Sequence, residues 1–298
     1  MSRLLKEKVN GPRKLRELLS SRDVILAPGA FDALSARLVE SAGFEAVYMT
    51  GFGTSAGLLG YPDVGLLTMT EMVENARRIV DAVNIPVIAD ADTGYGNPIN
   101  VIRTVQEYEN VGVAGIHIED QIFPKKCGHI SGKEVVSVDD MVQKIAAAKD
   151  VKSRDFLLIA RTDAIAVEGL DSALERAKEY YKAGADMLFV EAPESMEQIE
   201  TISRELKGIP LLFNWAEGGK TPPVSLEDLR RLGFKLIIFP VSTLLSATSA
   251  MKSVLEQIRR DGTPLNVMDK LYPFRDFLSF IGLPEVQVLE KRYVTRRE

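Results

Sequence analysis

The sequence of 298 residues has few residues that form covalent crosslinks or bind soft metals: one cysteine and two histidines. One cysteine cannot form an intrachain disulfide, so the cysteine count gives no reason to expect an oxidising compartment. No apolar run approaches the ~20 residues needed to span a bilayer, and the first ten residues lack the apolar core of a signal peptide. The net charge of −5 gives no electrostatic reason to expect nucleic acid or an anionic membrane as a partner. We therefore expect a soluble, cytoplasmic protein.

What the sequence does contain is an alternation of short apolar runs with longer segments of helical period. Runs that are apolar throughout are typical of strands buried on both faces of a parallel sheet. The expected strands are 24–27, 46–49, 86–89, 115–118, 156–160, 187–190, 210–213 and 236–239. The expected helices between and after them are 31–42, 70–83, 97–111, 137–149, 170–183, 195–206, 225–232 and 243–260. Eight such units over ~240 residues predict a (β/α)8 TIM barrel, with a doubly wound open sheet as the alternative.

The end of the chain breaks this alternation. We interpret residues 1–298 as a single domain, with the barrel in 21–262 and a helical extension in 263–298. Two further helices, 267–281 and 284–293, are rich in aromatic and arginine residues. They are too polar to form a second core, and we expect them to pack on a neighbouring subunit.

Polar residues follow nearly every predicted strand, at the end where a barrel places its active site. Four carboxylates, with a fifth on a preceding loop, would converge there: Asp90, Asp92, Glu119, Glu191 and Asp63. Like charges a few ångströms apart repel by roughly 1–4 kcal/mol per pair, so they must be protonated, paired or gathered around a cation. An all-oxygen set predicts Mg²⁺, or Mn²⁺, rather than zinc. The alternative for Asp92 is that it only caps a turn.

The segment after the fourth predicted strand, 119–132, carries Lys125, Cys127 and His129 between flexible glycines. Such a loop can bring reactive groups to a site and then retract, although a lone cysteine is often only a small buried side chain. Arg161 and Lys125 supply positive charge for an anionic substrate. Together with Asn214 and the helix-start loop at Thr50–Gly51, they suit a 2-hydroxy or 2-oxo acid. The other histidine, His117, lies inside a strand and is expected in the core.

These motifs resemble the isocitrate lyase and phosphoenolpyruvate mutase superfamily, in its methylisocitrate lyase branch. The resemblance rests on residues 89–96, 115–121, 125–129 and 160–164, and it extends over nearly the whole chain. It implies a (β/α)8 barrel fold and a Mg²⁺-dependent enzyme that cleaves a carbon–carbon bond, as methylisocitrate lyases do in propionate catabolism. It also implies a homotetramer, a dimer of dimers that exchange a C-terminal helix.

The resemblance also implies a role for each matched residue. Asp90 would bind Mg²⁺ directly, while Asp63, Asp92 and Glu119 would hold its water ligands. The pyruvoyl part of the substrate would be held by Tyr48, Thr50, Gly51, Phe52 and Arg161. The other half of the substrate would meet Gly128, His129, Glu191 and Asn214. Cys127 would be the proton donor, with Lys125 and His129 tuning its acidity.

Two departures bear on the substrate. Where a methylisocitrate lyase is expected to have an arginine suited to a third carboxylate, this sequence has Leu245. The run 214–222 looks closer to dimethylmalate lyase and the plant petal death protein, which act on substituted malates and oxaloacetate. Cys127 argues against phosphonomutase chemistry. The open alternatives are C–C cleavage of 2-methylisocitrate or 2,3-dimethylmalate, hydrolysis or decarboxylation of oxaloacetate, phosphonopyruvate or carboxyphosphonoenolpyruvate chemistry, and a catalytically silent binding protein.

Overall fold

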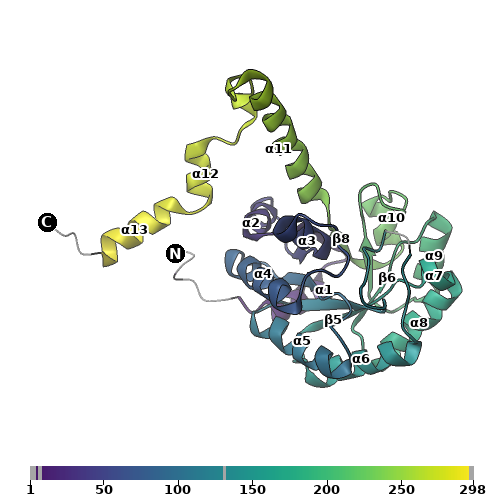
Figure 1. The fold of residues 1–298 in the computed structure, drawn as a ribbon. Coiled ribbons are helices and arrows are strands. Elements are labelled where there is room, and N and C mark those ends of the chain that lie inside the picture. Colours follow the sequence, from purple (N-terminus) through teal and green to yellow (C-terminus); the bar gives the residue numbers. More distant parts are fainter. Residues whose placement is uncertain (1–4, 6–8, 130–131, 295–298) are drawn as a thin grey trace. The chain divides into compact units, whose positions relative to one another are not determined.

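The structure, a computed structural model, describes residues 5, 9–129 and 132–294. Eight parallel strands pair in sequence order, and β8 pairs with β1, so the sheet closes into a barrel (Figure 1). The strands are β1 (Ile25–Ala30), β2 (Val47–Met49), β3 (Val87–Asp90), β4 (Gly115–Glu119), β5 (Leu157–Thr162), β6 (Met187–Val190), β7 (Leu211–Asn214) and β8 (Phe234–Phe239). The predicted (β/α)8 barrel is confirmed, and the open sheet is excluded.

Helices alternate with the strands along the chain. They are α1 (Gly11–Ser21), α2 (Ala33–Ser41), α3 (Gly51–Leu59), α4 (Met69–Ala82), α5 (Pro98–Asn110), α6 (Val138–Val151), α7 (Ile165–Glu168), α8 (Leu170–Ala183), α9 (Met196–Glu205), α10 (Leu226–Arg231) and α11 (Ser242–Asp261). Beyond them lie a 3₁₀ helix, η2 (Leu265–Lys270), and two α-helices, α12 (Phe274–Phe280) and α13 (Leu283–Tyr293). None of the helices in the described part of the chain combines the length and apolar character needed to cross a membrane.

The core has two layers because successive strand residues point to opposite faces of the sheet. Leu157 and Ile159 of β5 belong to the cluster inside the barrel, which α1 joins through Leu15. Leu158 of β5 belongs to the larger cluster between the barrel and its helices, together with Tyr108 of α5. This two-sided burial is the reason that the strands read as uninterrupted apolar runs.

Most predicted elements differ from the observed ones by at most three residues at an end, but three observed helices, α1, α3 and α7, were not among the predicted ones. α3 contains three glycines in nine residues, which gives it a weak helical signal. Its start is nevertheless well capped, because the Thr50 side chain accepts a hydrogen bond from the Gly53 N–H at 3.1 Å. The predicted helix 267–281 was wrong as one element, because Pro273 separates η2 from α12.

Contacts within the chain divide it into two compact units, with the boundary after Leu245, inside α11. One compact unit is Val9–Leu245, which contains the whole barrel, and the other comprises the described residues of Met1–Lys8 and Ser246–Glu298. The second unit carries many large apolar side chains that the single chain leaves exposed, among them Leu255, Leu265, Phe274 and Val288.

Candidate active site

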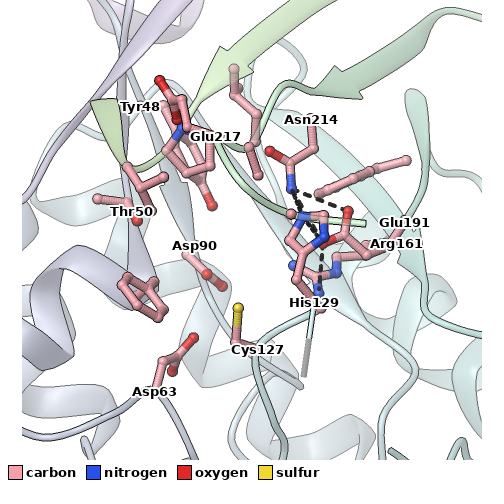
Figure 2. Close-up of a pocket in the computed structure, with 18 of the residues that line it drawn as sticks. Tyr48, Thr50, Asp63, Asp90, Cys127, His129, Arg161, Glu191, Asn214 and Glu217 are labelled. Carbon is pink, nitrogen blue, oxygen red and sulfur yellow. Dashed lines mark hydrogen bonds and ion pairs between the residues drawn. The ribbon is translucent and has the colours of Figure 1, made fainter. Parts of the chain in front are cut away.

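A cavity of roughly 240 Å³ opens at the carboxyl ends of the strands and is lined by residues from six of the eight strands and from the loops that follow them (Figure 2). Ten of the predicted substrate, metal and catalytic residues line it: Tyr48, Thr50, Phe52, Asp63, Asp90, Lys125, Cys127, Gly128, His129 and Arg161. Glu191 and Asn214 line it as well. Three predicted residues, Gly51, Asp92 and Glu119, lie behind this wall, each next to a residue that lines it. The volume suits a small acid rather than a nucleotide or a cofactor of drug size.

Asp90, at the end of β3, stands at the floor of the cavity. Its Oδ1 accepts a hydrogen bond from the Asp92 N–H at 2.9 Å, which fixes the carboxylate. Burial opposes its ionisation, but the basic groups around it prevail and hold the pKa of Asp90 below its usual value. A side chain at position 51 would clash with Asp90 Oδ2, so glycine is required there for α3 to start this close to the carboxylate.

Lys125 neutralises the other two aspartates of the group. Its Nζ lies 2.5 Å from Asp63 Oδ1 and 2.7 Å from Asp92 Oδ1. Burial lowers the pKa of Lys125, but Asp92, Asp90 and Asp63 outweigh burial and raise it well above the ordinary value. Burial raises the pKa of Asp92 to about 6. The ammonium of Lys125 is therefore committed to these carboxylates, and its predicted role of tuning the Cys127 thiol has no direct contact to support it.

Arg161, on β5, is the second buried cation. Its Nε and Nη2 hold Asp163 at 2.8 and 3.0 Å, and Nε lies 3.2 Å from Glu119 Oε2. Nη2 also lies 3.5 Å from Glu191 Oε1. In the described part of the chain these ion pairs use Nε and Nη2, so Nη1 remains to bind a substrate carboxylate. Burial raises the pKa of Glu119 well above its usual value, although Arg161 opposes the shift.

The opposite wall joins the loop after β4 to β6 and β7. His129 Nδ1 accepts a hydrogen bond from the Lys220 N–H at 3.1 Å, and its Nε2 lies 3.7 Å from Glu191 Oε1. Asn214 Nδ2 donates to both oxygens of Glu191 at 3.2 Å. The Asn214 Oδ1 atom is buried and has no hydrogen-bond partner among the described residues, which leaves it for a ligand. A side chain at Gly128 would clash with Glu191, so at this position only the backbone of the loop packs against Glu191.

Cys127 points into the same cavity as Asp90 (Figure 2). Its N–H donates to the Asp63 carbonyl at 3.1 Å, which ties the loop to the segment after α3. Burial raises the pKa of the Cys127 thiol to about 11. A thiol with this pKa is protonated at neutral pH, so it can give a proton but is a poor nucleophile.

The raised pKa of Cys127 predicts how its alkylation depends on pH. Because only the thiolate reacts, the rate with iodoacetamide should rise by about tenfold per pH unit from pH 8 to 10. N-acetylcysteine, measured beside it, should level off near its ordinary pKa of about 8.5. The measurement is the second-order rate constant across this range, and a plateau for the protein below pH 9.5 would contradict the raised pKa.

Tyr48, which lines the cavity, forms a buried pair with His117 behind it. The Tyr48 hydroxyl lies 2.8 Å from His117 Nε2. Burial lowers the pKa of His117 to about 4 and raises that of Tyr48 well above its usual value. Both groups are therefore neutral near pH 7, which makes Tyr48 a hydrogen-bonding group rather than an anionic base. The prediction that His117 lies in the core is confirmed.

The residues fit a hard divalent ion in two respects. The donors that line the cavity on this side are carboxylate oxygens, and Glu119 Oε1 is buried with no hydrogen-bond partner in residues 5, 9–129 and 132–294. However, no three His, Cys, Asp or Glu side chains in these residues converge as a complete ligand cage. An ion that keeps several waters, as Mg²⁺ does, needs only one or two protein carboxylates, and Asp90 is placed to be one.

Two residues of this region were not assigned roles from the sequence. Asp163, which clamps Arg161, was noticed after the fifth strand but was given no function. Lys133 was not singled out, although its Nζ lies 2.8 Å from Asp163 Oδ1. An arginine at the buried end of a strand needs an acidic partner, so Asp163, two residues after Arg161, could have been predicted to pair with it. Nothing in the sequence indicates that the loop brings Lys133 back to Asp163.

Comparisons with known proteins show what this chain is similar to. A family model described as phosphoenolpyruvate phosphomutase matches residues 15–259. The chain is 48% identical over 290 residues to a 2,3-dimethylmalate lyase of Eubacterium barkeri, covering 97% of this chain and 100% of the relative. It is 47% identical over 268 residues to a 2-methylisocitrate lyase of Aeropyrum pernix, covering 90% and 86%.

Solved structures give the same result. The structure of oxaloacetate acetylhydrolase with the inhibitor 3,3-difluorooxalacetate has a TM-score of 0.91 and 39% identity, covering 98% of this chain and 100% of that one. A phosphonopyruvate hydrolase bound to oxalate and Mg²⁺ has a TM-score of 0.87 and 31% identity, covering 99% and 100%. With matches of this extent, the chain belongs to the phosphoenolpyruvate phosphomutase family and is an enzyme of the PEP mutase/isocitrate lyase superfamily.

Proposed function

We propose that this enzyme is a Mg²⁺-dependent carbon–carbon lyase that cleaves the C2–C3 bond of a 2-hydroxy di- or tricarboxylate and releases pyruvate. The candidate substrates are substituted malates such as 2,3-dimethylmalate, and 2-methylisocitrate, which would also give succinate. The observation that carries the proposal is that one small cavity contains a protonated thiol, Cys127, a carboxylate placed to hold a metal ion, Asp90, and a buried cation for an anionic substrate, Arg161. A lyase of this kind needs all three.

The metal belongs to the proposal because of the donor chemistry. Asp90 would bind Mg²⁺, or Mn²⁺, and the group of Asp63, Asp92 and Glu119 would hold its waters. The bound ion would supply a Lewis acid that polarises the substrate oxygen. The phosphonopyruvate hydrolase structure with oxalate and Mg²⁺ supports this assignment, because oxalate presents the same pair of adjacent oxygens as a 2-oxo acid.

The chain's own residues account for the remaining steps. Arg161 binds the carboxylate of the pyruvoyl half through Nη1 and stabilises the alkoxide that forms when the C2 hydroxyl gives its proton to solvent. This alkoxide becomes the carbonyl of pyruvate as the C2–C3 bond breaks. The backbone at Thr50–Gly51 and the side chains of Tyr48 and Phe52 hold this half in place. Electrons of the broken bond pass to C3 of the leaving half, where Cys127 donates its proton to carbon.

The leaving half carries a second carboxylate, which must be bound across the cavity. His129 and the Gly128 backbone supply donors there, while Asn214, whose Nδ2 donates to Glu191, presents its Oδ1, unpaired among the described residues, as an acceptor. Leu245 and Val241 line the same cavity and offer no cation for a third carboxylate. We therefore favour a substituted malate over a tricarboxylate.

A second activity, hydrolysis or decarboxylation of oxaloacetate, is favoured by one observation. The similarity to oxaloacetate acetylhydrolase extends over 98% of the chain, and oxaloacetate also carries two carboxylates. Phosphonopyruvate chemistry remains the third alternative. The products separate them: hydrolysis of oxaloacetate gives oxalate and acetate, its decarboxylation gives pyruvate and CO₂, and hydrolysis of phosphonopyruvate gives pyruvate and phosphate.

The deciding experiment is a substrate panel. The purified enzyme would be incubated with Mg²⁺ and, separately, with 2,3-dimethylmalate, 2-methylisocitrate, isocitrate, oxaloacetate or phosphonopyruvate, and pyruvate and other products followed. We expect pyruvate from 2,3-dimethylmalate, no activity after EDTA treatment, and recovery when Mg²⁺ or Mn²⁺ is returned. Turnover that survives complete removal of divalent ions, or product only from phosphonopyruvate, would contradict the proposal.

We also propose a homotetramer, a dimer of dimers that exchange the C-terminal helices. The support is the apolar surface of η2, α12 and α13, where Leu265, Phe274 and Val288 are 73%, 74% and 64% exposed in the single chain. A surface of this kind is typical of one that packs on another subunit. Light scattering should give about four times the 32.9 kDa mass of the chain, and a monomer at all concentrations would exclude the exchange.

A further inference from the structure

Lys133 is a buried lysine that the proposed reaction does not use. It is 8% exposed, and its ammonium donates to Asp163 Oδ1 at 2.8 Å and to the Gly128 carbonyl at 2.5 Å. Gly128 follows Cys127 in the loop after β4, whereas Asp163 follows β5. One side chain therefore joins the segment that carries the proton donor to the strand end that carries Arg161.

The contact between Lys133 and Asp163 leads directly to Arg161. Lys133 and Arg161 share Oδ1 of Asp163, and Arg161 Nε holds the other oxygen, Oδ2, at 2.8 Å. Asp163 itself is fixed, because its N–H donates to Asp120 Oδ1 at 2.9 Å. The Gly128 carbonyl is thus tied to the Arg161 guanidinium through one ammonium and one carboxylate.

The other anchors of the loop lie elsewhere. The Cys127 N–H reaches the Asp63 carbonyl at 3.1 Å. The Gln121 side chain holds the backbone of Lys126 at both its N–H and its carbonyl, at 2.9 and 2.7 Å. These contacts fix the loop on the side of Asp63 and β4. The contact on the side of Arg161 comes from Lys133.

We propose that Lys133 is a positioning residue, which fixes Cys127–Gly128 against the Arg161–Asp163 pair and so sets the proton donor relative to the carboxylate that Arg161 binds. The catalytic part of this inference rests on the proposed lyase function. Removing the ammonium would leave the Gly128 carbonyl without its donor and the buried Asp163 with one cation fewer. Hydrogen bonds to charged groups contribute more than neutral ones, so the loop would lose a strong contact.

The test is Lys133→Met, with Lys133→Arg as the charge-conserving variant. We expect kcat on the best panel substrate to fall by about 10- to 100-fold, with KM within about threefold, because a charged hydrogen bond is lost but the substrate contacts remain. Alkylation of Cys127 by iodoacetamide at pH 8.5 should become at least about fivefold faster, because the loop no longer shields the thiol. Lys133→Arg should restore most of both values.

The matched control is Lys126→Met, which removes the same charge from the same loop. The Lys126 ammonium contacts the Gly132 carbonyl of its own loop rather than Asp163. We expect near wild-type kcat and alkylation rate in this variant. Alkylation at the wild-type rate in Lys133→Met, or equal effects of Lys133→Met and Lys126→Met, would overturn the proposal.

The proposal can still be tested if Lys133→Met does not fold or if no panel acid is cleaved. If Lys133→Met fails to fold, the double variant Lys133→Met/Asp163→Asn removes the unpaired carboxylate together with the ammonium. Its Cys127 alkylation rate should still be raised, and a wild-type rate there would also overturn the proposal. Alkylation needs no substrate, so it tests the position of the loop even if the wild-type enzyme cleaves none of the panel acids.

Discussion

Replacing Cys127 with serine is expected to lower kcat by about 10²- to 10⁴-fold, the range over which a positioned acid accelerates a reaction. The hydroxyl of serine is far less acidic than the thiol, so proton transfer to carbon is impaired. Mg²⁺ binding should be unchanged, because Cys127 is placed with the leaving half of the substrate. The measurements are kcat with the best panel substrate and calorimetric titration of Mg²⁺.

A reaction in D₂O provides the control for this variant. In the wild-type enzyme, one deuterium should enter the leaving fragment on a single face, because the exchangeable thiol delivers it from one side. Residual turnover of Cys127→Ser should place deuterium on both faces, because solvent replaces the missing donor. A wild-type rate with single-face labelling in the variant would remove Cys127 from the mechanism.

The second large effect is expected at Arg161. Arg161→Lys should lower kcat/KM by about 10²- to 10³-fold, as for loss of one donor that stabilises a developing oxyanion. An ammonium can pair with Asp163 but cannot hold that carboxylate with two parallel bonds and also present a donor to the substrate. The charge is retained, so the buried Glu119 and Glu191 keep a cation nearby and the protein should still fold.

Arg176→Lys is the matched control, because Arg176 is also buried and also holds a carboxylate with two nitrogens. Its Nε and Nη2 bind Glu168 at 2.8 and 2.9 Å, and neither residue lines the cavity. This variant should lose stability in thermal unfolding but keep its kcat/KM. If both variants lost activity to the same extent, the effect of Arg161→Lys would reflect folding rather than substrate binding.

The barrel and most of its site could be predicted from the sequence because the relevant signals are local. A strand buried on both faces leaves an apolar run, and the polar residue that ends the run falls at the active-site edge of a barrel. Asp90, Arg161 and Asn214 were found in this way. The helix α3 was missed because its glycines, needed for the approach to Asp90, also erase the helical pattern.

The sequence did not predict which basic side chain pairs with each carboxylate. The acids were counted as one cluster around a metal, but the structure divides them: Lys125 takes Asp63 and Asp92, while Arg161 takes Glu119. Loops of unequal length bring these ion-pair partners together. The number of residues between two charged side chains therefore does not predict whether they meet. Lys133 escaped notice for the same reason, since its partner lies 30 positions along the chain.

The bare backbone at Gly128 restricts how this enzyme could be redesigned. Even a methyl group there would meet the Glu191 side chain, so the loop face of the cavity cannot be reshaped by substitution at that position without moving Glu191 or the loop. The wall formed by Val241 and Leu245 has no comparable restriction, because its side chains are partly exposed and take no part in the ion-pair network of the cavity. Attempts to admit bulkier acids should therefore begin at that wall and leave the thiol-bearing loop intact.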